Sequence, residues 1–150
     1  MTITTIHPQI DKVLDKLFMA HKIYNQIVSS ENCPNRNIYR ELAEHTDEIL
    51  NGFADVFKID RSEIELDFLE KSKLTWDQVG IELHGLLIEY SNKKVLEYCI
   101  NYEEQLNAEL REAIKEAAFV KEEKQVLANA LITSTSFIST LRLEHETYQF

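Results

Sequence analysis

Apolar residues recur every three or four positions through most of the chain, which is the spacing of one face of an α-helix. The clearest apolar stripe runs from Val95 to Ala117. One carboxylate, Glu103, interrupts this stripe one helical turn after Cys99 and one turn before Leu106. A carboxylate that faces a core costs several kcal/mol unless a proton, a hydrogen bond or a cation compensates it. In a helical bundle, such a carboxylate is a candidate metal ligand.

The same periodicity predicts helices over residues 8–28, 38–57, 76–90, 93–117 and 121–141. Pro8 suits the first turn of a helix, and Asn35 and Asn37 are candidate caps for the second segment. Thr75 is the predicted N-cap of the third segment. Residues 91–92, Ser-Asn, favour a break before the fourth segment, although an i,i+4 pair between residues 89 and 93 would also suit a continuous helix.

Residues 58–73 alternate apolar and acidic side chains, with Ile64, Leu66 and Phe68 between carboxylates. The acidic positions make a free strand unfavourable, so we interpret this segment as a connector that docks a few apolar side chains. The connection between the second helix and the Glu103 helix is then long and contains a helix of its own. A long middle connection predicts an up-down-down-up, ferritin-like four-helix bundle with a crossover between its second and third helices.

The composition supports an all-α fold. Only three glycines and two prolines occur among 150 residues, fewer than the turns of a β-sandwich or an α/β fold require. Hydrophobic residues make up 44% of the chain, an ordinary fraction for a folded protein. The length fits a single domain over residues 1–150 that can bury a core without disulfides.

The formal net charge of −10 argues against nucleic-acid binding and against anionic membrane surfaces. No run of basic residues marks an exception, and no segment suggests a membrane span. Cys33 and Cys99 form no C-x-x-C pattern, and residues 1–7 lack a basic stretch followed by an apolar one. We therefore expect a cytoplasmic protein with reduced cysteines.

Residues 76–110 carry a family resemblance. A tryptophan opens a short helix, a polar break follows, and Val95-Leu96-Glu97-Tyr98-Cys99 leads to Tyr102-Glu103-Glu104. This pattern resembles an uncharacterised bacterial family of ferritin-like four-helix bundles, with Glu103 in the place of the family's glutamate. Asn101-Tyr102 replaces the family's small residues, and Glu104 stands for its aspartate. The resemblance implies the fold, and the family has no established reaction.

Ferritin-like di-iron sites need Glu-x-x-His pairs, and no histidine of this chain has a glutamate three residues before it. A weaker ligand set remains. If the helices fold back at residues 29–35 and near residue 119, His21, Glu41, His45 and Glu103 lie at one level with Ser134 or Thr135. Two imidazoles and two carboxylates can bind zinc or iron. The same groups can also satisfy one another as a hydrogen-bonded polar layer.

No serine sits in a strand-turn-helix elbow, and no glycine loop for phosphate is present. The leading hypothesis is a non-enzymatic bundle that is structural, stress-related or partner-binding, with self-association through Trp76, Phe68 or Tyr148–Phe150. The alternative is an iron- or zinc-binding protein or remnant oxidoreductase built on the polar layer. A third interpretation, an apolar-ligand pocket under the crossover, depends on Gly80 and Gly85.

Overall fold

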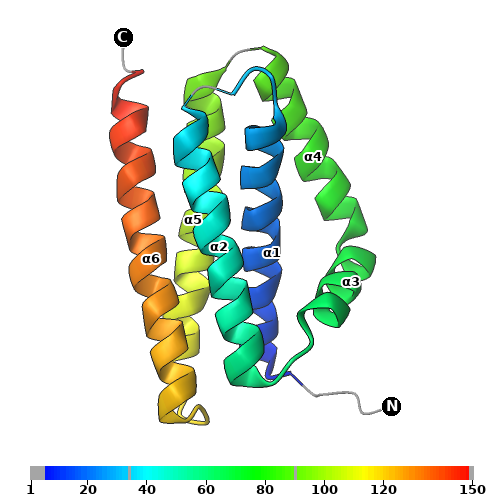
Figure 1. Ribbon diagram of the computed structural model, residues 1–150, viewed down its shortest axis with the longest axis vertical. Coiled ribbons are helices and arrows are strands. Elements are labelled where there is room, and N and C mark those ends of the chain that lie inside the picture. Colours follow the sequence, from blue (N-terminus) through cyan, green and yellow to red (C-terminus); the bar gives the residue numbers. More distant parts are fainter. Residues whose placement is uncertain (1–5, 34, 90, 149–150) are drawn as a thin grey trace.

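The computed structural model describes residues 6–33, 35–89 and 91–148, and within these ranges it is all-α with no strands (Figure 1). This confirms the predicted fold class. The described residues form six helices: α1 (Pro8–Ser29), α2 (Arg36–Phe57), α3 (Arg61–Lys71), α4 (Lys73–Ile88), α5 (Asn92–Ile114) and α6 (Lys121–Glu146).

The long helices α1, α2, α5 and α6 lie side by side. Helix α1 packs against α2 and α5, α5 packs against α6, and α2 meets α6 along a looser seam. The shorter helices α3 and α4 lie outside this group, with α3 against α1 and α2 and α4 against α1 and α5 (Figure 1). Helices α2 and α5 both run downward in Figure 1, with α3 and α4 between them in the chain. Assignment to the ferritin-like class stays a prediction.

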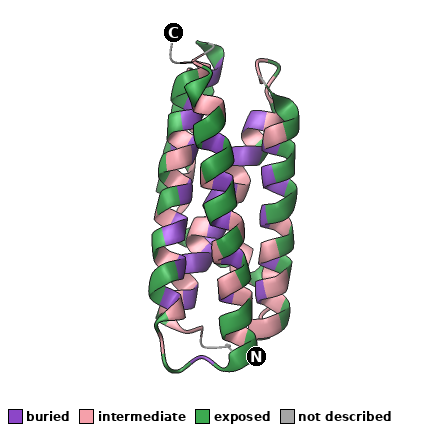
Figure 2. Ribbon diagram, turned by 90° about the vertical axis from the view of Figure 1, so that its left-hand side faces the viewer, coloured by how far each residue is buried: buried purple, intermediate pink, exposed green. Residues whose placement is uncertain are grey.

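Helix α1 has the most completely buried apolar face. It begins at Pro8, and the His7 side chain before it accepts a hydrogen bond from the backbone N–H of Gln9 at 3.0 Å. Buried residues line the sides of the helices that face one another (Figure 2). Those of α1 include Ile10, Val13, Leu14, Leu17, Phe18, Ile23 and Ile27. Because α1 contacts four other helices, its face organises most of the core.

The interpretation of residues 58–73 as a non-helical connector is wrong, because helix α3 covers Arg61–Lys71. Asp60 caps this helix by accepting from the backbone N–H groups of Ser62 and Glu63. Of the three alternating apolar residues, only Ile64 and Phe68, which are four residues apart, pack against the core. Leu66, between them, is 62% exposed. A helix needs only one apolar stripe, so the acidic residues between these positions remain in solvent.

Several predicted boundaries shift. Helix α4 begins at Lys73, so Thr75 lies within its first turn and is not the N-cap. Asn35 occupies the N-cap position of α2 in a left-handed backbone conformation, with φ at 48°, and its side chain makes no capping hydrogen bond. Helix α5 ends at Ile114, so Ala117 lies in the turn beyond it. The predicted break before α5 is confirmed at Ser91, and α5 begins at Asn92, one residue before the predicted start. The predicted third helix end at residue 90 and Pro34 lie outside the described residues.

Helix α6 departs from the expectation that no segment of the chain suggests a membrane span. Among the described residues it is the one helix whose length and composition would allow it to cross a membrane. The reason is a run over residues 125–141 without a charged side chain. In the bundle, this helix buries Leu127, Ala130, Ser134, Phe137 and Leu141, and 28% of its most apolar stretch is buried.

Candidate functional site

Glu103 lies in the core of the bundle, with only 1% of its surface exposed. Its position in the apolar stripe of α5 turns it toward α1 and α6. The hydroxyl of Tyr24 on α1 donates to Oε1 at 2.5 Å, and the hydroxyl of Ser134 on α6 donates to Oε2 at 2.7 Å. Each carboxylate oxygen therefore has a buried donor, which compensates part of the cost of burying the charge. We call Tyr24, Glu103 and Ser134 the carboxylate centre.

Burial dominates the protonation behaviour of the carboxylate centre. It raises the pKa of Glu103 above the ordinary value of 4.5, while the hydrogen bonds from Tyr24 and Ser134 oppose this shift. Burial, with Glu103 nearby, also raises the pKa of Tyr24 well above its ordinary range. The thiol of Cys99 is fully enclosed, and its pKa is raised by burial and by Glu103. A thiol kept protonated in this way is a poor nucleophile.

A polar chain connects the carboxylate centre with the surface. The amide of Asn107, one turn after Glu103, donates to Ser134 Oγ at 3.4 Å and to Thr135 Oγ1 at 3.1 Å. Arg111, a further turn along α5, donates from Nε to Asn107 Oδ1 at 2.7 Å. Among the described residues, every buried side-chain nitrogen or oxygen has a hydrogen-bond partner. The polar interior is therefore internally satisfied.

His21 belongs to a different set of contacts. Its Nε2 atom lies 3.1 Å from Asn25 Nδ2 and 3.6 Å from Asp47 Oδ1. Arg61 of α3 donates to the same carboxylate oxygen of Asp47 at 2.6 Å. Burial lowers the pKa of His21, Asp47 opposes this shift, and the nearby Arg61 charge adds to it. His21 thus helps to join α1, α2 and α3 at the edge of the bundle.

Glu41 and His45 lie together on the exposed side of α2. His45 Nε2 is 3.7 Å from Glu41 Oε1, and His45 Nδ1 is 3.7 Å from Glu48 Oε2. The side chains of the two glutamates are 72% and 74% exposed, and that of His45 is 45% exposed. These are solvated i,i+4 and i,i+3 ion pairs on one helix, and pairs of this kind contribute little to stability.

The four predicted metal ligands thus divide among three places. Glu103 lies at the carboxylate centre, His21 at the α1–α2–α3 edge, and Glu41 with His45 on the rim of α2. Within the described residues, no group of three or more His, Cys, Asp or Glu side chains is arranged to hold a metal ion. The predicted ligand set does not fit a shared iron or zinc ion.

Of the predicted polar layer, the buried pairing of Glu103 with Ser134 is formed, whereas Glu41 and His45 pair with each other on the exposed side of α2. The role of Tyr24 as a donor to Glu103 was not predicted, although its place on the apolar face of α1 is a sequence signal for a buried hydroxyl. Asn107 was also missed. It follows Glu103 by four residues, the spacing that continues one helix face, and this spacing was the available signal.

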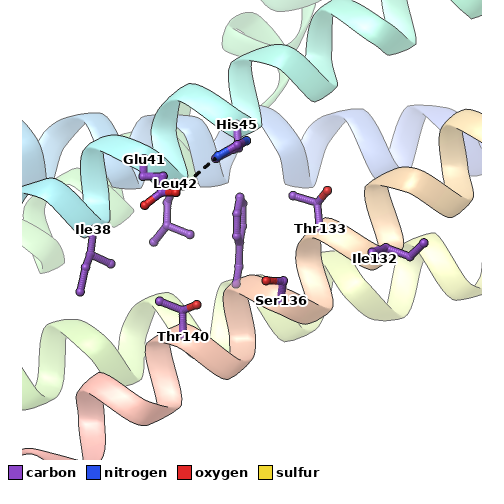
Figure 3. Close-up of a pocket in the computed structure, with 9 residues that line it drawn as sticks. Ile38, Glu41, Leu42, His45, Ile132, Thr133, Ser136 and Thr140 are labelled. Carbon is purple, nitrogen blue, oxygen red and sulfur yellow. Dashed lines mark ion pairs between the residues drawn. The ribbon is translucent and has the colours of Figure 1, made fainter.

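The looser seam between α2 and α6 contains a groove. One pocket of about 320 Å³ and another of about 220 Å³ share His45 and Thr133 as lining residues, so the two lie side by side along this seam. Ile38 and Leu42 of α2 lie across the larger pocket from the hydroxyl-bearing residues of α6 (Figure 3). The residues from α6 in this pocket are Ile132, Thr133, Ser136, Phe137 and Thr140. We call these two adjacent pockets together the α2–α6 groove.

The groove has chemically unlike walls. The α2 wall carries Glu41 and Glu48 with His45 between them, whereas residues 125–141 of α6 have no charged side chain. Phe137 is 8% exposed and lies at the floor, 6.0 Å from the ring of His45. One wall is thus acidic, the other is uncharged and rich in hydroxyls, and the floor is apolar.

Comparison with known proteins gives no relative on which to rest a function. No family model, no curated protein and no solved structure matches the chain.

Proposed function

We propose that the protein is a non-enzymatic, ferritin-like helical bundle that binds a partner protein through the α2–α6 groove. The ferritin-like assignment is supported by two adjacent helix pairs, α1 with α2 and α5 with α6, joined by the outer segment α3–α4. The observation that carries the binding role is the groove itself. It is an opening along the α2–α6 seam with an apolar floor.

The inner chemistry supports a role that is not catalytic. The carboxylate centre is enclosed, and both oxygens of Glu103 already accept hydrogen bonds from the protein. A general acid or base must reach a substrate proton directly or through one water molecule. Glu103 is therefore better suited to fixing the packing of α1, α5 and α6 than to acting on a substrate.

The groove walls specify the kind of partner. A helix laid along the groove would place apolar residues against Leu42 and Phe137. The same helix would need lysine or arginine on the flank that faces Glu41 and Glu48, and it would need no charge on the flank that faces α6. We therefore propose an amphipathic helix with one basic flank as the bound element.

A direct test uses a fluorescent, 18-residue amphipathic peptide with leucines on one face and lysines along one flank. We expect saturable binding in fluorescence anisotropy, and a peptide with glutamates in place of the lysines should not bind. In the double variant Glu41→Lys/Glu48→Lys, binding should weaken by about fivefold to tenfold, since two rim ion pairs become repulsive.

The matched control is the double variant Glu63→Lys/Glu70→Lys. These glutamates are exposed on α3 and are also seven residues apart, so the control changes net charge equally but leaves the groove intact. Binding by the control should equal that of the unchanged protein. Equal weakening in both double variants would show general charge attraction and would refute a groove-specific site.

Metal binding is the alternative, supported by the buried Glu103 and by the cluster of Glu41, His45 and Glu48 on α2. It is less well supported because these groups are separated. Elemental analysis of protein from iron- and zinc-supplemented cultures tests it. Stoichiometric metal that is lost in Glu103→Gln or in His45→Ala would favour this alternative.

A further inference from the structure

Helix α4 carries an apolar stripe that faces solvent. Leu74 is 87% exposed, Ile81 is 68% exposed and Ile88 is 55% exposed. They are seven residues apart, and such positions drift by only about 20° around a helix. The opposite face of α4 buries Val79, Leu83 and Leu87. A helix that is apolar on both faces is normally covered on both faces.

The inner side of α4 already has its partners within the chain. Gln26 Nε2 donates to the backbone oxygen of Gly80 at 2.9 Å, and Asn32 Nδ2 donates to that of Leu87 at 3.1 Å. From α5, the hydroxyl of Tyr98 donates to Glu82 Oε2 at 3.0 Å. These bonds fix which side of α4 faces the bundle. The apolar stripe is left on the outer edge of the molecule, where α4 lies in Figure 1.

The aromatic residues predicted as self-association contacts are used inside the chain. Phe68 is 2% exposed, so the prediction that it forms an exposed contact is wrong. Its ring lies 5.7 Å from that of Trp76, and Lys22 Nζ lies 3.9 Å above the Trp76 ring. Tyr148 packs partly against the core, and residues 149–150 lie outside the described residues. The exposed apolar surface of this region is therefore the stripe on α4.

The two glycines of α4 differ in a way that points to a neighbour outside the chain. A Cβ atom added at Gly80 would lie 3.6 Å from side-chain atoms of Lys22 and of Gln26, so packing against α1 accounts for this glycine. A Cβ atom added at Gly85 would meet no described atom within 4 Å beyond its own helix. Glycine weakens a helix relative to alanine, and nothing within the described chain uses the space at Gly85. It lies between Ile81 and Ile88 on the exposed face.

We propose that α4 pairs with α4 of a second copy of this chain, antiparallel, across a two-fold axis at Ile81. The stripe is evenly spaced about Ile81, so reversal of one copy places Leu74 of each opposite Ile88 of the other. Ile81 then meets Ile81. A surface with this internal symmetry is complementary to itself, as a two-fold interface requires. This self-association is separate from the partner groove, because α4 lies outside the α2–α6 seam.

The polar residues beside the stripe also match in this register. Asp77 and His84 lie on one flank, four residues before and three residues after Ile81. In a two-fold antiparallel pair, each flank meets the same flank of the other copy. Asp77 of one copy therefore lies level with His84 of the other copy, and the two-fold axis repeats this pair. On the other flank, Gln78 of one copy lies level with Gly85 of the other. The missing side chain at Gly85 leaves room for this longer one.

The negative charge of the chain limits which faces two copies can bring together. Each chain carries a formal charge of −10, so most orientations of two copies place acidic surfaces together. The α4 stripe brings apolar residues together and sets Asp77 level with the imidazole of His84, while Glu82 and Glu89 lie about a quarter-turn round the helix from the stripe. A second copy therefore fits the internal symmetry of this face.

The test measures the mass of the full chain by sedimentation equilibrium from 5 to 200 µM. We expect a monomer–dimer equilibrium, and Ile81→Glu should raise the dissociation constant at least tenfold because two carboxylates would meet at the axis. The matched control is Ile132→Glu on α6, where an isoleucine of nearly equal exposure, 69%, lies away from α4. This control should keep the dimer. Far-UV circular dichroism confirms that both variants remain folded.

The register has its own test. Asp77→Lys should weaken the dimer, and the double variant Asp77→Lys/His84→Asp should restore it, since a carboxylate then lies level with the new lysine ammonium group. A parallel pair would not be restored, because Asp77 and His84 would then lie on flanks that do not meet. A chain that is monomeric at 200 µM, or a dimer that survives Ile81→Glu, would overturn the proposal. Loss of the dimer in Ile132→Glu alone would also overturn it.

Discussion

Helix α6 takes part in two seams of opposite character. The seam with α5 is closed around a buried carboxylate, and Ser134 there is 1% exposed. The seam with α2 is open, its carboxylates lie on the rim, and Ser136 is exposed at the groove. The two serines are only two residues apart in sequence, yet one completes a hydrogen bond in the core and the other faces solvent. The chemical role of a polar residue in this bundle is set by its helix face.

This comparison also separates stability from recognition. The carboxylate centre joins α1, α5 and α6 through directional hydrogen bonds in a low-dielectric interior, where an unpaired partner is costly. The rim pairs of His45 with Glu41 and Glu48 are solvated and contribute little to stability. Changes in the closed seam should therefore unfold the protein more readily, whereas changes in the open seam should affect binding.

The largest expected effect is that of Glu103→Ala. It leaves the hydroxyls of Tyr24 and Ser134 without their acceptor and opens a cavity, so we expect the free energy of unfolding to fall by about 2 kcal/mol. Urea denaturation followed by circular dichroism measures this. The control is Glu104→Ala, the adjacent glutamate, whose ion pair with Arg142 is exposed. The change in the free energy of unfolding for Glu104→Ala should stay within about 0.5 kcal/mol. Equal losses in both variants would contradict the contrast between the buried and the exposed glutamate.

A smaller effect should distinguish the two serines of α6. Ser134→Ala removes one of the two donors to Glu103, so we expect a loss of about 1 kcal/mol in the free energy of unfolding. Ser136→Ala changes an exposed hydroxyl on the groove and should cost no more than about 0.5 kcal/mol. The same urea titrations serve both variants. If Ser136→Ala were the more destabilising change, the assignment of the closed and open seams would be reversed.

The smallest expected effect is the pH dependence due to Glu103, since its hydrogen bonds oppose the effect of burial. Its pKa is raised above 4.5 in the folded protein, so the folded state holds this proton where the unfolded chain has released it. Its contribution to stability is therefore most favourable below about pH 4.5 and is lost as the pH rises through the folded pKa. We expect the unchanged protein to gain stability relative to Glu103→Gln as the pH falls from neutrality toward this value.

Comparison with Glu103→Gln isolates this carboxylate from other titrating groups. The pKa of His21 is lowered by burial, so its contribution has the opposite sign and is lost as the pH falls through its folded pKa. His21 is present in both proteins, and its effect cancels in the difference. Urea titrations at a series of pH values give that difference, and a relative loss for the unchanged protein on acidification would contradict a raised pKa at Glu103.

The sequence predicted the helices well where a single apolar stripe was long and regular. The starts of α1 and α6 and the break before α5 follow from Pro8, from residues 120–121 and from Ser91. Helix α3 was missed because its short apolar pattern, taken two residues at a time, also fits a connector. Its N-cap at Asp60 was the available signal, since a carboxylate there accepts from the first backbone N–H groups of the helix.

The carboxylate centre was predicted in part. The position of Glu103 in the stripe of α5 predicted its burial, and the fold-back of α5 and α6 near Phe119 placed it level with Ser134 or Thr135, of which Ser134 is the partner. The predicted metal ligands, in contrast, do not come together in the structure. His21 and His45 lie at comparable heights along the bundle axis, but His21 faces Asp47 and His45 faces solvent. The height of a residue along a helix follows from its residue number, whereas the direction of its side chain depends on how the helix is rotated in its packing.

The sequence by itself determined an all-α chain with a buried carboxylate, because helical periodicity is local and identifies which residue lies within an apolar stripe. Tertiary structure alone decided that Tyr24 meets Glu103, that α2 and α6 remain apart as a groove, and that one face of α4 is left uncovered. Each of these depends on the distance and rotation between helices far apart in the chain. Those quantities are set by the packing of many side chains together, and no single segment encodes them.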